Sequence, residues 1–302
     1  EIEYIQEIWK SSSNAVLLFG DAGSGKSGIA LRLGQLLSYQ GASVLFLRAN
    51  DFPYNQDPIS IIQNRTALNT PLLHGLQILS ERKEVVIIVD QLDTVAGSDL
   101  GKSFVSFINS LAGIQKIKLL AVSRDYEYRN DPDISKFNFQ TVLSGELSAE
   151  QSKLFLSQLG IREPSQEILN LSTNLLNLSL IGEVTKRIDF STKNLMSRAE
   201  LWRHYINSIQ LREGDDVADY ILQLSRTVTA RGERTFTVSF PKAEYRRKLL
   251  SRGILVEAPG RRYGFRHMQI QEFLCAYSFL PEQSNIQRLK EEINNPLLRG
   301  VI

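Results

Sequence analysis

The stretch GDAGSGKS at residues 20–27 constrains the fold of this chain more than any other feature. It matches the pattern G-x-x-x-x-G-K-[ST], and it lies between an apolar, strand-like run at 15–19 and a segment at 28–40 with leucines at helical spacing. Glycines let such a loop curl so that successive N–H groups point into one anion-sized cavity, and the following helix adds its dipole. The context predicts a phosphate-binding loop.

Individual residues of this loop have separate tasks in a phosphate site. Lys26 can reach the β- and γ-phosphates of a nucleotide, and Ser27 can offer its hydroxyl to Mg²⁺. We therefore expect a nucleotide and Mg²⁺ as ligands. The residues expected to hold the phosphates are Gly20, Asp21, Ala22, Gly23, Ser24, Gly25, Lys26 and Ser27.

Four further apolar runs follow the loop in the first half of the chain, at 43–48, 84–90, 117–123 and 140–143. They alternate with helical segments. Near-continuous apolar strands in this arrangement are typical of a parallel sheet covered by helices on both faces. Residues 1–147 are thus predicted to form an α/β domain of the P-loop NTPase type, with a parallel five-stranded sheet.

Two carboxylates follow the apolar run at 84–90. Asp90 stands at the carboxyl end of the predicted strand, the edge at which open α/β sheets bind ligands, so it can hold Mg²⁺ together with Ser27. Asp93 lies three residues further on and can polarise a water molecule beside the γ-phosphate. Asp93 has a second interpretation, in which it caps a helix or turn.

Arg124 follows the apolar run at 117–123 and is expected at the same edge of the sheet. An arginine there can sense or stabilise a γ-phosphate. The competing interpretation is a structural ion pair with Asp125 or Glu127, which are its neighbours in sequence.

The second half of the chain reads differently. SAEQ at 148–151 is a capping box, and a helical domain without a convincing strand is predicted over 148–212. Residues 213–280 are predicted to be winged-helix-like, with helices near 217–228 and 243–253, strand-like pieces at 254–258 and 262–266, and a last helix. Residues 281–302 read as the start of a truncated helical region.

Composition excludes several classes of protein. The chain has 302 residues, 42% of them hydrophobic and 23% charged, which is typical of a soluble globular protein. No apolar run reaches the ~18–20 residues of a membrane span, and the single Cys275 suits a reducing cytoplasm. A net charge of +2 indicates neither a nucleic-acid binder nor a membrane binder overall. Because the chain begins with Glu1, we expect a piece of a longer protein.

Four motifs occur in an order that resembles one family. GDAGSGKS, IIVDQLD, LLAVSR and YGFRHMQIQEFLCAYSFL, taken together, look like the STAND class of signal-transducing P-loop ATPases, and most like its NACHT-type branch. The resemblance spans about residues 11–280. It implies nucleotide-binding, helical and winged-helix domains around ATP or ADP. Members are switches, closed with ADP, that open and self-associate with ATP after a ligand reaches a sensor domain. Many bacterial members act in defence against phage.

The resemblance also implies a function for His267, the first residue of an apolar helical stripe that continues at 270–277. In the family this histidine reaches the β-phosphate of ADP and locks the closed state. By itself, such a histidine is more often a core residue with a backbone partner. One departure concerns hydrolysis: Thr94 stands where the family often has an acidic residue. Hydrolysis then rests on Asp93 alone, or is slow.

A basic segment at 242–266 keeps a different function open. It holds Lys242, Arg246, Arg247, Lys248, Arg252, Arg261, Arg262 and Arg266. An initiator-like ATPase could bind DNA phosphates through such a winged helix, whereas the simpler interpretation is a solvated or internally paired face. A small-molecule kinase and a scaffold that binds nucleotide without hydrolysing it are two further alternatives.

Overall fold

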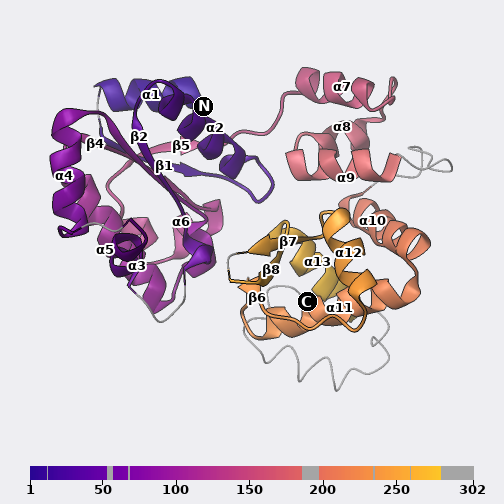
Figure 1. The fold of residues 1–302 in the computed structure, drawn as a ribbon. Helices are drawn as coiled ribbons and strands as arrows, with labels where there is room; N and C mark the ends of the chain where they lie inside the picture. Colours follow the sequence, from indigo (N-terminus) through magenta and orange to yellow (C-terminus); the bar gives the residue numbers. More distant parts are fainter. Residues whose placement is uncertain are drawn as a thin grey trace. The chain divides into compact units, whose positions relative to one another are not determined.

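The computed structural model describes residues 1–11, 13–52, 57–66, 69–185, 197–233, 235–258 and 260–279 (Figure 1). The chain divides into two compact units, Glu1–Glu146 and Leu147–Ile302. Within the described ranges no helix is long and apolar enough to cross a membrane. The predicted helical region at 281–302 lies outside the described residues.

Unit 1 is built on a five-stranded parallel sheet, as the apolar runs predict. Its strands are β1 (Ala15–Phe19), β2 (Ser43–Arg48), β3 (Val85–Asp90), β4 (Ile117–Val122) and β5 (Gln140–Leu143). The order across the sheet is β2-β3-β4-β1-β5, and every pairing is parallel. Because β4 lies between β1 and β3, the segment after β4 enters the space between the phosphate loop and Asp90.

Helices cover both faces of this sheet (Figure 1). Successive strand residues alternate between two cores: Val86 and Ile88 pack with α1 and α2, whereas Ile87 and Val89 pack with α3, α4 and α5. The helices are α1 (Ile2–Ser11), α2 (Lys26–Tyr39), α3 (Pro58–Thr66), α4 (Leu72–Arg82), α5 (Asp99–Ala112) and α6 (Asp125–Asn130). Short 3₁₀ turns occupy Ala49–Asp51, Leu92–Val95 and Ile134–Lys136.

Unit 2 begins with the capping box predicted at 148–151. The Ser148 hydroxyl accepts from the Gln151 amide at 3.1 Å, and the Gln151 side chain accepts from the Ser148 amide at 2.9 Å. The elements that follow are α7 (Ala149–Gln158), α8 (Gln166–Ser172), α9 (Leu175–Thr185), α10 (Arg198–Glu213), α11 (Asp215–Ala230), β6 (Thr235–Phe236), α12 (Ala243–Ser251), β7 (Leu255–Ala258), β8 (Arg262–Phe265) and α13 (Met268–Ser278). One hydrophobic cluster runs from Leu156 in α7 to Leu274 in α13.

A small antiparallel sheet, in the order β6-β8-β7, lies in the last part of unit 2. The strands at 254–258 and 262–266 are as predicted, but β6 adds a third strand that the sequence analysis did not predict. Its two residues are too few to show a period of alternation. Within the last helix, Ile270 and Leu274 are buried as the stripe predicts.

Candidate nucleotide-binding site

The loop at 20–27 has the backbone shape that its glycines allow. Gly20, Gly23 and Gly25 have φ angles of 152°, 85° and 93°, a region that side chains with a Cβ atom rarely occupy. Gly25 is the N-cap of α2 and supplies no side-chain hydrogen bond, so the first N–H groups of α2 are not capped by a side chain. A helix of this length with an uncapped start after a glycine loop favours an anion at that position.

Lys26 lies within the curl of the loop. Its Nζ donates to the carbonyl oxygens of Gly20 at 2.8 Å and Asp21 at 2.7 Å. The residue is only 8% exposed, and burial lowers its pKa. Its hydrogen-bond partners are neutral carbonyls, and the carboxylates of Asp93, Asp21 and Asp90 only partly offset the effect of burial on its pKa, so an incoming phosphate offers the ammonium a stronger partner.

Ser27 and Asp90 meet although 63 residues separate them. The Ser27 hydroxyl donates to Oδ1 of Asp90 at 3.0 Å, and the Gln91 amide donates to the same oxygen at 2.9 Å. Asp90 is 1% exposed, and burial raises its pKa to about 6. Its second oxygen, Oδ2, is buried without a hydrogen-bond partner. Such an orphaned carboxylate oxygen is costly unless a cation or water completes it.

These residues fit a magnesium ion. Mg²⁺ favours one or two protein oxygens together with substrate phosphates and water. The Ser27 hydroxyl and the free Oδ2 of Asp90 supply oxygens of this kind beside the loop. Among the described residues no three His, Cys, Asp or Glu side chains form a metal cluster, so a site here depends on the phosphates for further ligands.

Asp93 and Arg124 form an ion pair at the same edge of the sheet. Nε of Arg124 lies 3.0 Å from Oδ2 of Asp93, and the two side chains are 20% and 8% exposed. The alternative partner Asp125 instead pairs with Arg129 at 2.8 Å. The sequence analysis placed both residues at the γ-phosphate, and the structure pairs them with each other. Each side chain is therefore engaged in this ion pair in the absence of nucleotide.

Two further polar atoms at this edge are buried without partners. They are Oε1 of Gln91, which adopts a left-handed φ of 62° directly after Asp90, and Oγ of Ser123 at the end of β4. Like Asp90, these residues stand at or just after the carboxyl ends of the neighbouring strands β3 and β4. An edge with three such atoms is suited to hold water or a polar ligand.

Three contacts at the edge were not predicted from the sequence. Arg48 ends β2 directly opposite Asp90, and its charge lowers the pKa of that carboxyl against the effect of burial. The Asp125 amide donates to the Gly20 carbonyl at 3.1 Å, and Ser144 touches the loop from β5. Arg48 is the last residue of a predicted strand and Ser144 directly follows one, which is the signal that could have found them, whereas Asp125 lies two residues past the predicted strand at 117–123.

His267 belongs to unit 2 and stands at the N-cap of α13, just before the helix. Its side chain makes no capping hydrogen bond, and the residue is exposed. It is therefore not a core residue of the stripe. Partial withdrawal of the ring from water lowers the pKa of His267, and the adjacent Arg266 lowers it further.

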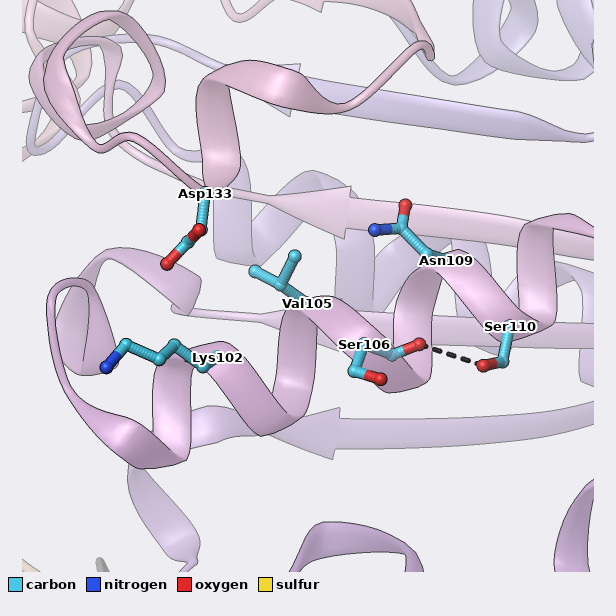
Figure 2. Close-up of a pocket in the computed structure, with 6 residues that line it drawn as sticks. All are labelled: Lys102, Val105, Ser106, Asn109, Ser110 and Asp133. Atoms are coloured by element: carbon cyan, nitrogen blue, oxygen red, sulfur yellow. Dashed lines mark hydrogen bonds between the residues drawn. The ribbon is translucent and has the colours of Figure 1, made fainter.

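A groove of about 550 Å³ lies on unit 1 away from the loop. Figure 2 shows its lining by side chains of α5 and by Asp133. Its two charged residues have partners, since Lys102 pairs with Asp99 at 3.0 Å and Asp133 with Lys136 at 3.7 Å. None of the predicted site residues lines this groove, and its exposed polar groups do not define a ligand.

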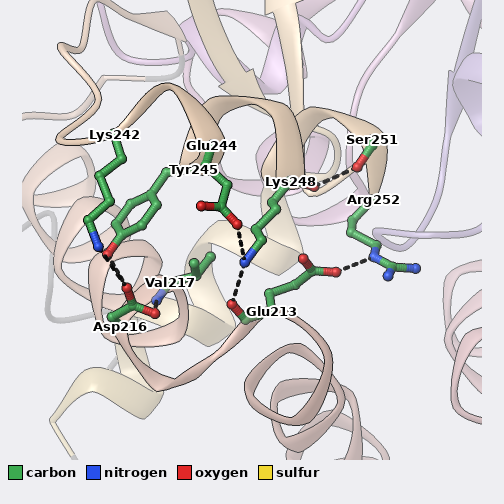
Figure 3. A network of polar contacts seen from close by, with 9 residues as sticks. All are labelled: Glu213, Asp216, Val217, Lys242, Glu244, Tyr245, Lys248, Ser251 and Arg252. Carbon is green, nitrogen blue, oxygen red and sulfur yellow. Dashed lines mark hydrogen bonds and ion pairs between the residues drawn. The ribbon is translucent and has the colours of Figure 1, made fainter.

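Part of the basic segment of unit 2 is ion-paired, and Figure 3 shows the pairs of Lys242, Lys248 and Arg252. Four of its eight cations meet carboxylates: Lys242 meets Asp216, Arg246 meets Glu257, Lys248 meets Glu244, and Arg252 meets Glu213. Arg262 donates to the Thr235 carbonyl. Half of the cations in the segment are thus compensated by carboxylates within unit 2, which reduces the basic face that could contact DNA phosphates.

No family model and no curated protein matches this chain. Solved structures do. A STAND protein with a tetratricopeptide repeat sensor from Pyrococcus horikoshii aligns with 97% of this chain at 15% identity and a TM-score of 0.53. The chain spans 46% of the length of that protein.

Two further solved structures are similar at lower scores. A Walker-type ATPase of Pyrococcus abyssi shows 14% identity and a TM-score of 0.45 over 90% of this chain and 94% of its own. The DnaA protein of Aquifex aeolicus, bound to AMPPCP, shows 14% identity and a TM-score of 0.45 over 99% and 89%. The likeness to the STAND protein confirms an α/β P-loop ATPase fold, followed by a helical part.

Proposed function

We propose that the chain is an ATP-binding, slowly hydrolysing switch module of a multidomain signalling protein of the STAND class. The observation that carries this proposal is the hydrogen bond from the Ser27 hydroxyl to Oδ1 of Asp90 at 3.0 Å. The second oxygen of Asp90, Oδ2, is buried without a hydrogen-bond partner. In this proposal residues 1–147 bind the nucleotide, 148–212 form a helical domain, and 213–280 form a winged-helix-like domain.

Binding rests on the loop and on α2. The N–H groups of residues 20–27 and the uncapped start of α2 face the phosphates, and Lys26 exchanges its two carbonyl partners for phosphate oxygens. Ser27 and Asp90 hold Mg²⁺, which neutralises phosphate charge when bound. The preference for adenine comes from the family resemblance alone.

Hydrolysis rests on Asp93 and Arg124. Asp93 orients the attacking water, and Arg124 stabilises charge on the γ-phosphate. Because the two side chains are paired at 3.0 Å and largely buried, the pair must open before either group can act. This cost supports a slow turnover.

The regulatory step rests on His267. Its exposed imidazole makes no capping bond to α13, so it is available to an anionic partner. In the proposal it donates to the β-phosphate of ADP in the closed state, where the phosphate raises the pKa of His267, which partial desolvation of the ring and the adjacent Arg266 lower. ATP then favours opening and self-association, triggered by a ligand that a sensor domain of the multidomain protein binds.

Release of phosphate from ATP in the presence of Mg²⁺, without any added acceptor, tests the enzymatic part. We expect slow, metal-dependent release that disappears in Asp93→Ala, while ADP remains bound. Phosphate transfer to a small molecule with no release to water would instead indicate a kinase. Retention of ADP with no turnover in either protein would indicate a scaffold.

Retention of ADP in His267→Ala tests the switch. We expect faster ADP release and more self-association than in the wild-type protein. The matched control is His74→Ala, a histidine of α4 in unit 1 to which the proposal gives no role. Equal ADP release from wild type and His267→Ala would contradict the latch.

DNA binding through the basic segment is not part of this proposal, because four of its eight cations are ion-paired within unit 2. Binding to a random duplex over a series of salt concentrations decides the matter. The pairing predicts weak affinity with a shallow dependence on salt, whereas a steep dependence at low salt would revive the initiator-like alternative.

A further inference from the structure

Ser144 occupies a place that no part of the proposed function uses. It follows β5 directly, and β5 pairs in parallel with β1, so that Phe19 lies opposite Leu143. The residue after β5 therefore lies beside the residue after β1, which is the first glycine of the phosphate loop. Ser144 is 4% exposed.

Three contacts join Ser144 to the loop and its strand. Its amide donates to the carbonyl of Phe19 at 2.7 Å, and its hydroxyl donates to the carbonyl of Ser24 at 3.2 Å. Its own carbonyl oxygen lies so close to Gly20 that a Cβ atom there would approach it to 2.9 Å. One residue thus holds both the beginning and the middle of the loop.

The carbonyl of Ser24 needs such a partner because of how a phosphate loop works. When the N–H groups of a loop converge on an anion, the carbonyls of the same peptides point away from it and need donors behind the loop. Lys26 serves the carbonyls of Gly20 and Asp21, but phosphate competes for that ammonium. The donor from Ser144 has no competing role, so it remains when the lysine turns to phosphate.

We propose that Ser144 is a positioning residue of the phosphate loop, which keeps the loop's N–H groups directed at bound nucleotide through its bond to the Ser24 carbonyl. This inference rests on the proposed nucleotide site. Without nucleotide, Lys26 also holds the loop through the carbonyls of Gly20 and Asp21, but with nucleotide bound it turns to phosphate. Loss of the Ser144 hydroxyl should therefore weaken nucleotide binding more than it lowers the stability of the nucleotide-free protein.

The test compares Ser144→Ala and Ser144→Cys with wild type in the full chain. Cysteine keeps the approximate size of the side chain beside Gly20 but is a weak donor, so it remains informative if alanine disturbs folding. ADP affinity is measured by calorimetry with Mg²⁺ and without it, and the melting temperature is measured without nucleotide. Ser110→Ala is the control. The Ser110 hydroxyl also donates to a carbonyl, that of Ser106, but at an exposed position of α5 (Figure 2).

We expect both variants to bind ADP about three- to tenfold more weakly, which is what one neutral hydrogen bond contributes. Their nucleotide-free melting temperatures should stay close to that of wild type, and Ser110→Ala should match wild type in both measurements. Unchanged ADP affinity in Ser144→Cys would overturn the inference, as would a loss of affinity that only follows a fall in melting temperature. If wild type itself binds no ADP, the proposed function fails instead.

Discussion

Two polar regions of this chain contain similar residues but differ in how completely their hydrogen bonds are made. The phosphate edge of unit 1, which comprises residues 20–27 with Asp90, Asp93 and Arg124, leaves buried polar atoms unpartnered at the carboxyl ends of β3 and β4. The α11–α12 network of unit 2 comprises Glu213, Asp216, Lys242, Glu244, Tyr245, Lys248 and Arg252 (Figure 3). Among the described residues, none of the network's side-chain atoms is buried without a partner.

The difference shows how a ligand site can be told from a structural network. Both regions are rich in charge, and the sequence analysis considered both as ligand sites. Buried polar groups that serve only the fold are normally satisfied by the protein itself. Oδ2 of Asp90 at the phosphate edge is buried without a hydrogen-bond partner, whereas the charged groups of the network, most of them exposed, pair with one another, and this contrast favours the nucleotide hypothesis over the DNA hypothesis.

The largest expected effect comes from Lys26→Ala. It removes the ammonium from the phosphate edge, and a charge-assisted contact with phosphate is lost. We expect ADP affinity to fall by about 100-fold or more, measured by competition with a fluorescent nucleotide. Lys102→Ala, which changes an exposed lysine of α5, should bind as wild type does. Unchanged affinity in Lys26→Ala would remove the site assignment.

Asp93→Asn should act on hydrolysis and leave binding intact. The amide keeps the shape of the side chain but is a poor base and a weaker partner for Arg124. We expect the rate of phosphate release to fall by about 100-fold, with ADP affinity within about threefold of wild type. Asp99→Asn, at an aspartate that is 94% exposed, is the control. Equal rates in wild type and Asp93→Asn would leave Asp93 as a structural partner of Arg124 only.

The pKa of Asp90 predicts a pH-dependent stability of the nucleotide-free, metal-free protein. Its folded-state pKa of about 6 is raised above the ordinary 3.8, so the neutral carboxyl stabilises the fold below about pH 4 and this contribution is lost as pH rises through 6. Asp90→Asn should therefore be more stable than wild type at pH 8 by about 3 kcal/mol, and the gain should vanish near pH 3–4. Denaturation at a series of pH values checks this, and a loss of stability at pH 8 would contradict the account.

In the complete network the effects should be confined to stability. Arg252→Ala leaves Glu213, whose side chain is 7% exposed, without its guanidinium partner. We expect the free energy of unfolding to fall by about 1–3 kcal/mol with no change in ADP affinity. Arg247→Ala, within α12, removes no ion pair found in the described residues and should cost about 0.5 kcal/mol or less. A change in ADP affinity in Arg252→Ala would erase the contrast between the two regions.

The parts of the fold that were predicted correctly are those marked by a short local sequence pattern. The strands at 15–19 and 43–48 are found as predicted, because a buried parallel strand is a continuous apolar run. The capping box at Ser148 is also present, since it depends on residues within one turn of helix. The two-residue strand β6 lacks such a pattern and was missed.

The site was predictable only where a motif or a strand end marked it. Ser27 and Asp90 were assigned together because both motifs end at the same edge of a parallel sheet, and their hydrogen bond agrees with this. The ion pair between Arg124 and Asp93 was not predicted, because it joins the ends of the neighbouring strands β3 and β4, whereas the sequence analysis considered only sequence neighbours as ion-pair partners of Arg124. Ser144 was missed for the same reason: its contacts arise from the pairing of β1 with β5.

The central claim is that the incomplete hydrogen bonding of the phosphate edge marks a nucleotide site. Calorimetric titration of the wild-type chain with ADP and Mg²⁺ tests this most directly. The account predicts saturable binding of one nucleotide per chain, with an affinity that falls when Mg²⁺ is removed because Oδ2 of Asp90 then loses its cation. Absence of binding at nucleotide concentrations on the order of 1 mM would contradict it.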